Sequence, residues 1–565
     1  MGQVFNQPER HLIWNVARSV IEANLGTGRL KTCPTRKGRD VSTLVRANAW
    51  LENASDWLNP ILIKETRQAL KSRQFIVTFL LMLIASWLIS VFGTLMAGDS
   101  LEFGSTGRGL FTSYFVVLAM AIFVVVPYSA FRGLLNERDQ TTLELLNITS
   151  LSPRQLVWGK LWSAMAQVFI FYSAIAPFIA FTSMLQGFDV ALVAYVLVIS
   201  LVVTLCLTML TLMLAAIPQN KQLQGLMTGL IFGGLLFVIS MIFSTVPWLL
   251  METISFDETE FWVGTGSLLV AGLSFFYLFT QIATAHLTFD ADNRSTGIRI
   301  ACSLQFFLYW LVFICQKSLL GRGSVSGDVE FMVTISVLYV AVSGFFAATE
   351  PDFVSRRVRR GIPKTTLLRL LSAPFLPGGH RGFVFLLLHL ALIPVFVESL
   401  VVGTFTGSHW EGWWTITFLL YVVIYVGLGS AFGRALRRVS SEVRPMHVRV
   451  IICILLAMGI IVPSLPLLFG PREYEWLSRL LRVTDPFKIL SLMHNNAYNR
   501  DIATHEIVTL WSAAGLGLLL NVRPMWVGVM EVLRNWATPN VTHSRKSGVD
   551  PFATKMPDFL EKPDI

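Results

Sequence analysis

The chain has 565 residues, of which 54% are hydrophobic and 14% charged, and its mean hydropathy is +0.61. Soluble domains carry about 25% charged residues, so this composition excludes an ordinary soluble protein and indicates an all-α polytopic membrane protein. The net charge of +10 does not indicate nucleic-acid binding, because Lys and Arg cluster in segments between apolar stretches. The five cysteines show no Cys-x-x-Cys spacing, so we expect neither a disulfide framework nor a metal site.

About twelve stretches are apolar enough to cross a bilayer, which requires roughly 20 predominantly apolar residues. They are residues 76–97, 110–131, 161–183, 190–217, 225–250, 261–285, 300–318, 331–349, 383–403, 412–433, 450–470 and 505–522. The last stretch is short and can also be interpreted as an interfacial helix. No apolar stretch precedes residue 76, so we expect the first span to act as its own insertion signal.

The charge of the connecting segments predicts the orientation of the spans. The segments rich in Lys and Arg are 132–160, 350–382 and 434–449. The segments poor in them are 98–109, 184–189 and 251–260. Because basic segments remain in the cytoplasm, both termini are expected there. The segment 471–503 would lie outside despite its basic residues, and we expect it to hold a surface helix followed by a short helix that starts at Asp485-Pro486-Phe487.

These spans divide the chain into regions. The expected regions are a cytoplasmic N-terminal region with an interfacial helix (1–74), a first six-span domain (75–285), a cytoplasmic connector (286–299), a second six-span region (300–522) and a partly disordered cytoplasmic tail (523–565). The second region contains no copy of the polar segment that connects spans two and three, so a simple internal duplication is not supported.

That polar segment, 132–160, contains two helix-start signals. Thr141 with Glu144 fits a capping box, and Ser152 with Gln155 fits a second one, with Pro153 at the first helical position. Compact charged helices at the ends of membrane spans indicate a surface presented to a soluble partner. The alternative interpretation is a solvated connector without a partner.

Two stretches resemble the permease subunits of the second export type of ABC transporter, in the long bacterial form. Residues 59–67, Asn-Pro-Ile-Leu-Ile-Lys-Glu-Thr-Arg, resemble the elbow helix of that family. Residues 137–160, which contain Glu-Arg-Asp-Gln-Thr-Thr-Leu-Glu-Leu-Leu at their start and Gly-Lys at their end, resemble its cytoplasmic coupling loop. The sequence departs from the family pattern at Thr141, where Gly is usual, and the Pro is displaced to Pro153. The resemblance covers residues 55–300, including the polar segment 290–299, and does not extend to the second six spans.

The resemblance implies a function for individual residues. The implied ATPase-coupling residues are Glu137, Thr141, Leu143, Glu144, Leu145, Leu146, Pro153 and Lys160, of which Glu137, Glu144 and Lys160 would be docking charges and the three leucines an apolar ridge. The implied elbow-helix residues are Asn59, Pro60, Lys64, Glu65 and Arg67. A separate ABC ATPase subunit would bind ATP and Mg, while this chain would bind no cofactor and catalyse no reaction. The location implied is the cell (inner) membrane, with either two copies of this chain or the second six spans completing the path.

The sequence contains no phosphate-binding loop, since the nearest fragment, residues 26–32, lacks the Gly-x-x-x-x-Gly-Lys-Ser/Thr spacing. Two ionisable residues, His389 and Glu398, lie in span nine and form the candidate intramembrane polar site. Their spacing places them on roughly opposite helix faces, so they cannot pair on that helix. Glu398 is either a lining or proton site or a residue hydrated near the outer interface, and His389 fits a packing role. The prolines Pro127, Pro177, Pro218 and Pro394 are candidate hinges.

The sequence therefore predicts the permease subunit of an ABC-type exporter, coupled to its ATPase through residues 137–160. Two alternatives remain open: a secondary transporter driven by an ion gradient, and a non-transporting membrane scaffold that anchors a cytoplasmic complex. An unrecognised membrane enzyme has no catalytic cluster to support it. The uniformly apolar spans do not identify a substrate.

Overall fold

The computed structural model describes residues 60–97, 106–139, 152–183, 189–217, 220–251, 256–289, 292–320, 325–352, 354–404, 410–440, 443–466, 477, 481–494 and 504–534. Within these residues every regular element is helical, and twelve helices are long and apolar enough to cross a membrane. The prediction of an all-α polytopic membrane protein with about twelve spans is confirmed.

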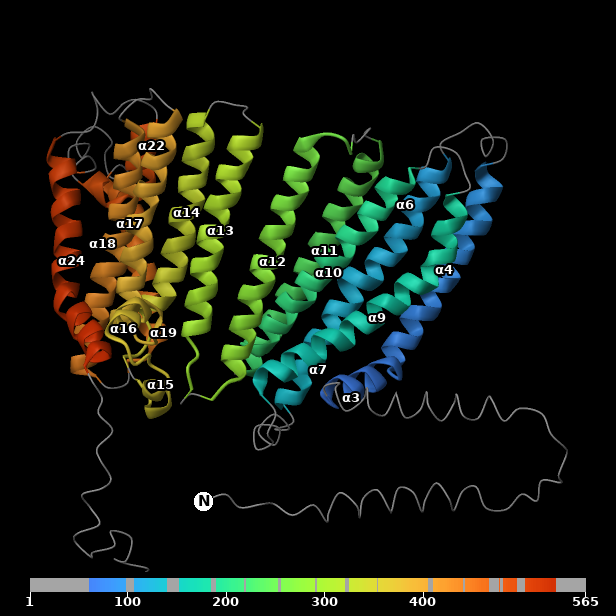
Figure 1. Ribbon diagram of the computed structural model, residues 1–565, viewed down its shortest axis with the longest axis horizontal. Coiled ribbons are helices and arrows are strands. Elements are labelled where there is room, and N and C mark those ends of the chain that lie inside the picture. The colour runs from blue at the N-terminus through green and yellow to red at the C-terminus, as the bar shows by residue number, and fades with distance from the viewer. Residues whose placement is uncertain are drawn as a thin grey trace, which may run out of the picture. The chain divides into compact units, whose positions relative to one another are not determined.

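Six spans belong to the first half of the chain (Figure 1). They are α4 (Arg73–Ala97), the continuous helix α6 (Thr106–Ala119), η1 (Met120–Val125) and α7 (Val126–Asp139), then α9 (Pro153–Thr182), α10 (Val190–Ala216), α11 (Lys221–Met251) and α12 (Thr259–Leu287). The spans of the second half are α13 (Thr296–Leu320), α14 (Val325–Ala348), α17 (Gly379–Thr404), α18 (Trp410–Val439), α19 (Pro445–Ile461) and α24 (Thr504–Leu533). Short helices connect or precede them: α3 (Pro60–Leu70), α15 (Arg356–Arg360), α16 (Thr366–Ser372), η2 (Ala373–Phe375), η3 (Val462–Ser464), η4 (Arg482–Thr484) and α22 (Pro486–His494).

Several helices are longer than the apolar stretches that predicted them. Residues 132–139 and 153–160, expected in the polar connection, continue α7 and α9. Residues 523–533, expected in the tail, belong to α24. The extension has a physical cause in α7, since Leu134 and Leu135 are buried against the bundle and keep the helix packed beyond its apolar core. The short helix expected at Asp485-Pro486-Phe487 is present, and Asp485 accepts hydrogen bonds from the N–H groups of Phe487 and Lys488.

Several hydroxyl groups inside the spans donate to backbone carbonyls, in most cases of the helix that carries them. In α10, Thr204 donates to the carbonyl of Ser200 and Thr208 donates to the carbonyl of Thr204, both at 2.7 Å. Thr211 bonds across to the carbonyl of Pro127 in α7 at 3.0 Å. Hydrocarbon offers these groups no water, so bonding to backbone carbonyls removes the cost of burying them.

The second span contains a π-helical turn, Met120–Val125, directly before α7, in which Pro127 is the second residue. The N–H of Val126 donates to the carbonyl of Ala121, five residues back. Pro127 lacks an N–H, and a wider turn next to it is a known way to absorb that loss. Pro177 and Pro394 lie inside α9 and α17, whereas Pro218 falls outside the described residues.

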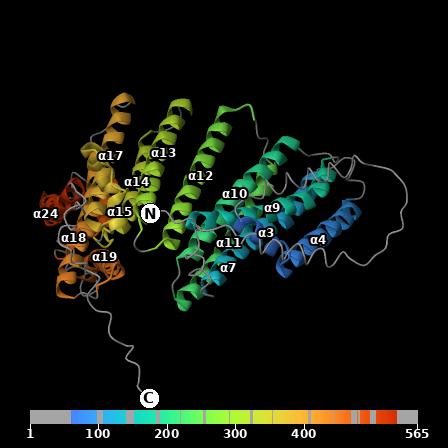
Figure 2. The ribbon, with the colours of Figure 1, turned by 60° about the horizontal axis from the view of Figure 1, so that its bottom comes forward.

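The two halves have separate apolar cores that meet along α12 and α13. One core is formed by α4 to α12 and the other mainly by α13 to α24. A smaller cluster joins them, in which Leu278 of α12 packs near Ala301 and Cys302 of α13. Figures 1 and 2 both show α12 beside α13, and these two helices are in extensive contact.

Arg299 at the start of α13 secures one end of this junction. Its guanidinium donates to the carbonyls of Pro374, Leu376 and Gly378 at 2.8, 2.6 and 3.1 Å and to Glu350 Oε2 at 2.6 Å. Gly378 has a φ of 128°, a conformation that favours glycine, and its N–H also donates to Glu350. One buried arginine therefore links the start of α13 to the end of α14 and the turn that begins α17.

Among the described residues, α14 and α17 form the most extensive helix–helix contact, and their close approach depends on glycine. A Cβ added at Gly382 would collide with the backbone carbonyl of Ala347, and one at Gly379 would lie 2.7 Å from the carbonyl oxygen of Ala348. Small residues of this kind allow backbones to approach where lipid provides no hydrophobic driving force.

We predict that Gly382→Ala destabilises the second half by about 1–3 kcal/mol, because the new methyl group collides with backbone that cannot rotate away. Reversible unfolding in mixed detergent micelles measures this loss. Gly264→Ala in α12 is the matched control, since nothing lies within 4 Å of its added Cβ. Equal stability of the two variants would contradict the close approach of α14 and α17.

Candidate functional site

The connection between α7 and α9 begins and ends on well-formed helices. Ser152 caps α9 as predicted: its hydroxyl accepts from the N–H of Gln155 at 3.3 Å, and its own N–H donates to Gln155 Oε1 at 2.9 Å. Pro153 occupies the first helical position. The other predicted coupling residues, Thr141, Leu143, Glu144, Leu145 and Leu146, lie outside the described residues.

A charged triad, Glu65–Lys160–Glu137, connects three helices at the base of this connection. Lys160 of α9 lies with its Nζ 2.9 Å from Glu137 Oε1 of α7 and 3.2 Å from Glu65 Oε2 of α3. The lysine side chain is only 5% exposed, and the two carboxylates are 21% and 16% exposed. One cation between two carboxylates therefore fastens α3 to both helices that flank the connection.

The triad changes the interpretation of two predicted docking charges. Glu137 and Lys160 were expected to face a partner, but the described structure pairs them with each other and with Glu65. The reason is helix periodicity: Lys160 shares a buried face of α9 with Leu156 and Ala164, so its side chain enters the bundle. Of the three predicted docking charges, Glu144 is therefore the one that does not belong to this triad.

An amphipathic helix forms before the first span, where the sequence predicts one. Pro60 begins α3, and the helix ends at Leu70 before a turn that leads into α4. Lys64 and Arg67 are exposed, whereas Glu65 is half-buried and reaches Lys160. Asn59 lies outside the described residues. The sequence pattern identified the amphipathic helix but gave no signal for the partner of Glu65, which is 95 residues away along the chain.

Aromatic side chains along α9 hold it against its neighbours. Phe171 packs on Phe75 of α4 with ring centroids 5.3 Å apart, and Trp158 meets Phe276 of α12 edge to face at 5.8 Å. These contacts are of the size that contributes about 1 kcal/mol beyond area burial. The helix that carries Lys160 is therefore fixed to α3, α4, α7 and α12.

The two intramembrane candidates lie apart. His389 is buried, with Nε2 2.8 Å from Ser303 Oγ of α13 and Nδ1 2.8 Å from the carbonyl oxygen of Phe385. Its ring contacts Phe385 at 4.2 Å between centroids. Glu398, in the last third of α17, is exposed. His389 thus has the geometry of a satisfied packing residue, and the two groups form no joint site.

A polar cluster in the second half was not predicted. Gln305 Nε2 donates to the hydroxyl of Tyr309 at 2.6 Å, and the hydroxyl of Tyr339 donates to Gln305 Oε1 at 2.9 Å. Ser274 of α12 donates to Tyr309 at 3.4 Å. The sequence held one signal for it, since Gln305 and Tyr309 are four residues apart on an otherwise apolar span and so share a helix face.

Among the described residues, no group of three or more His, Cys, Asp or Glu side chains is placed to hold a metal ion. Comparison with known proteins adds no assignment, because no protein-family model, no curated protein and no solved structure matches this chain. The geometry of the triad and of the polar cluster is therefore the main structural indication of function.

We predict that Lys160→Met destabilises the first half by about 2 kcal/mol, because two carboxylates would then face each other without a cation. The released elbow helix should also be cleaved faster by trypsin after Lys64 and Arg67. Lys221→Met is the control, since Lys221 is an exposed lysine at the start of α11. Unchanged stability and cleavage would show that Lys160 does not fasten α3.

Proposed function

We propose that this chain is the permease subunit of an ABC-type exporter, which forms the translocation path and is coupled to a separate ATPase through residues 137–160. The protein is a multi-pass membrane protein whose twelve apolar helices fit a transporter. The resemblance of residues 59–67 and 137–160 to the elbow helix and coupling loop of such permeases supports the finer assignment.

The observation that carries the proposal is the charged triad. A loop that transmits force needs both of its flanking helices to move together, and Lys160 connects α9 to α7 at 2.9 Å. The same lysine connects both to α3 at 3.2 Å. A partner that displaces residues 140–151 would therefore move α3, α7 and α9 as one body.

The second span is suited to carry this movement across the membrane. The continuous helix from α6 to α7 is the most buried of the twelve spans. Its π-turn lies near the middle of the span, where a helix bends most easily. Movement of α7 would then alter the packing of α6 on α4, α9 and α11, which α6 contacts.

An ATPase subunit with ATP and Mg would supply the energy, and this chain would catalyse no reaction itself. The path would be completed either by a second copy of the chain or by the spans α13 to α24. The cell (inner) membrane is the location that this proposal implies.

The proposal predicts that an ATPase co-purifies with the wild-type protein in mild detergent and is lost from Glu144→Lys, because the reversed charge repels the docking cleft. Mass spectrometry of the eluate and its rate of ATP hydrolysis measure the association. Glu258→Lys is the matched control and should retain the ATPase, since Glu258 caps the start of α12, which lies at the opposite end of the spans from the end of α7 (Figure 1).

A second variant separates docking from coupling. Lys160→Met should still bind the ATPase, because the loop is unchanged, but transport and ATP hydrolysis should no longer depend on each other. An eluate without any ATPase, or full retention by Glu144→Lys, would refute the exporter assignment. The scaffold alternative predicts that the wild-type protein binds its cytoplasmic partner normally and that neither the wild-type protein nor any variant transports a substrate.

The polar cluster around Gln305 favours one further candidate, a secondary transporter driven by an ion gradient. Such a protein needs a polar site at mid-depth, and Gln305, Tyr309 and Tyr339 lie near the middle of α13 and α14. Gln305 is fully buried.

This candidate predicts that a protonophore abolishes transport while ATP remains available, and that Gln305→Leu does the same by removing the cluster's central amide. Uptake into vesicles with an imposed pH gradient measures both effects. Gln222→Leu, at an exposed position on α11, is the control. Transport that persists without a gradient and requires ATP would exclude this candidate and favour the exporter.

A further inference from the structure

The short apolar helix α16, outside the spans, exposes its leucines instead of packing them against the protein. In α16, Leu367, Leu368, Leu370 and Leu371 are between 51% and 69% exposed. At 3.6 residues per turn they cover an arc of about 160°. Large apolar residues concentrated on one exposed face mark a contact with something apolar.

The charged residue of the same helix points the other way. Arg369 lies opposite the centre of the leucine arc, and its Nε donates to the carbonyl of Pro363 at 2.8 Å. Its guanidinium also donates to the carbonyl of Leu533, the last residue of α24, at 3.4 Å. The arginine therefore faces the protein and holds α16 against α24, while the leucines face away.

This polarity is the reverse of that of a soluble amphipathic helix, which buries its leucines and exposes its arginine. It matches a helix whose apolar face enters the boundary between lipid headgroups and acyl chains. The position agrees, since α16 contacts α24 and η2 and lies near the end of the spans that also carries α3, α15 and the end of α7 (Figure 1).

The neighbouring helix α15 supplies positive charge. Arg356, Arg360 and Lys364 are exposed, and within the described residues no carboxylate pairs with any of them. The other two arginines of α15 pair with carboxylates of the same chain: Arg357, whose side chain is exposed, with Asp292 at 3.0 Å, and Arg359 with Glu531 at 3.3 Å. The three remaining charges are thus free to meet anions outside the protein.

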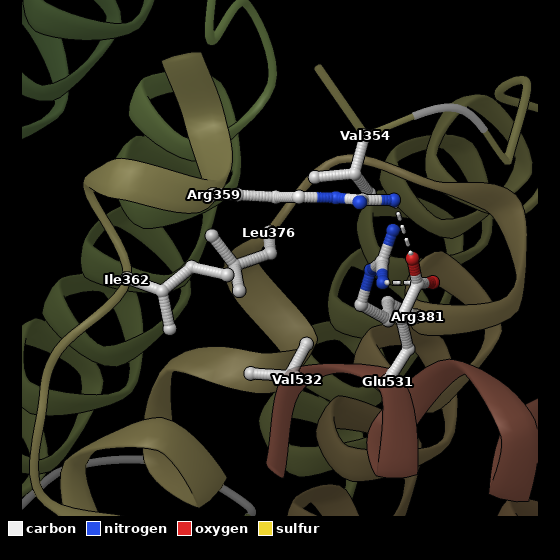
Figure 3. Close-up of a pocket in the computed structure, with 7 residues that line it drawn as sticks. All are labelled: Val354, Arg359, Ile362, Leu376, Arg381, Glu531 and Val532. Carbon is white, nitrogen blue, oxygen red and sulfur yellow. Dashed lines mark hydrogen bonds and ion pairs between the residues drawn. The ribbon is translucent and has the colours of Figure 1, made fainter. Parts of the chain in front are cut away.

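Ion pairs fasten the base of this segment to α24 (Figure 3). Arg359 and Arg381 both bond to Glu531 of α24, each at 3.3 Å, around a small hollow lined also by Val354, Ile362, Leu376 and Val532. The three charged side chains and the apolar wall surround this hollow, and their contacts hold α15, α17 and α24 together. Residues 356–375 are therefore attached to α24 through Arg359 and Arg369.

We propose that residues 356–375 form a lipid-binding surface, in which the leucines of α16 enter the bilayer interface and Arg356, Arg360 and Lys364 bind anionic headgroups of the same leaflet. The surface would anchor the ends of α14, α17 and α24 to the lipid and make the protein sensitive to headgroup charge. This inference does not depend on the exporter assignment, because it rests on a segment that the resemblance does not cover.

The test uses the full-length protein with its native cysteines replaced and with Leu367→Cys, to which an environment-sensitive fluorophore is attached. The labelled protein is reconstituted into bilayers that contain brominated phosphatidylcholine or brominated phosphatidylglycerol. Bromine on the acyl chains quenches a fluorophore only if it enters the hydrocarbon boundary. We expect quenching by both lipids at position 367, and none at position 351, a neighbouring exposed residue outside α15 and α16. Absence of quenching at position 367 would overturn the proposal.

Headgroup preference is measured in the same samples. Each basic residue near an anionic surface strengthens attraction roughly fivefold, so phosphatidylglycerol should quench at a several-fold lower mole fraction than phosphatidylcholine. Arg356→Gln, Arg360→Gln and Lys364→Gln together should abolish this difference and leave quenching by phosphatidylcholine intact. Arg154→Gln, an exposed arginine on α9, should change neither. A preference that survives the triple substitution would overturn the assignment of these three residues.

Discussion

The absence of water inside a bilayer is the constraint on which this structure depends. Each backbone and hydroxyl group within the spans has to bond inside the protein, which explains why the described residues form helices and why threonines of α10 bond to carbonyls one turn back. The same constraint moves charged groups to the helix ends. There they serve as fasteners, because a charge that is half-shielded from water bonds strongly to any nearby carbonyl or carboxylate.

Two such fasteners act in different ways. Lys160 connects three helices of the chain's first half, and its charge lies between two carboxylates. Arg299 bonds mostly to carbonyl oxygens exposed where helices begin and end, and so closes the junction of α13, α14 and α17. Arginine suits the second task because its planar group donates in several directions at once. The halves are thus stabilised separately and joined along α12 and α13.

Much of the architecture was predictable because it depends on local pattern. Twelve spans, the elbow helix at Pro60 and the cap at Ser152 are all set by residues within a few positions of each other. Contacts distant in the chain were not predictable, and Glu65 with Lys160 is the clearest case. The pairing of Glu137 with Lys160 was missed for the same reason, since only the fold shows that their charges meet. The ends of α7 and α24 were missed because packing, rather than hydropathy, extends those helices.

The π-turn in the second span fixes the rotational register of everything after it. A wide turn accommodates one more residue than an α-helical turn, so the faces of α7 are rotated by about 100° relative to a continuous α-helix. On the two sides of the turn the neighbours differ: α6 packs on α4, α9 and α11, whereas α7 packs chiefly on α10. Glu137 lies on the rotated part. If the turn tightened to an α-helix, α7 would rotate about its axis and Glu137 would move away from Lys160. A change in the π-turn at the middle of the span and the breaking of this ion pair at the end of α7 would therefore be consequences of the same rotation.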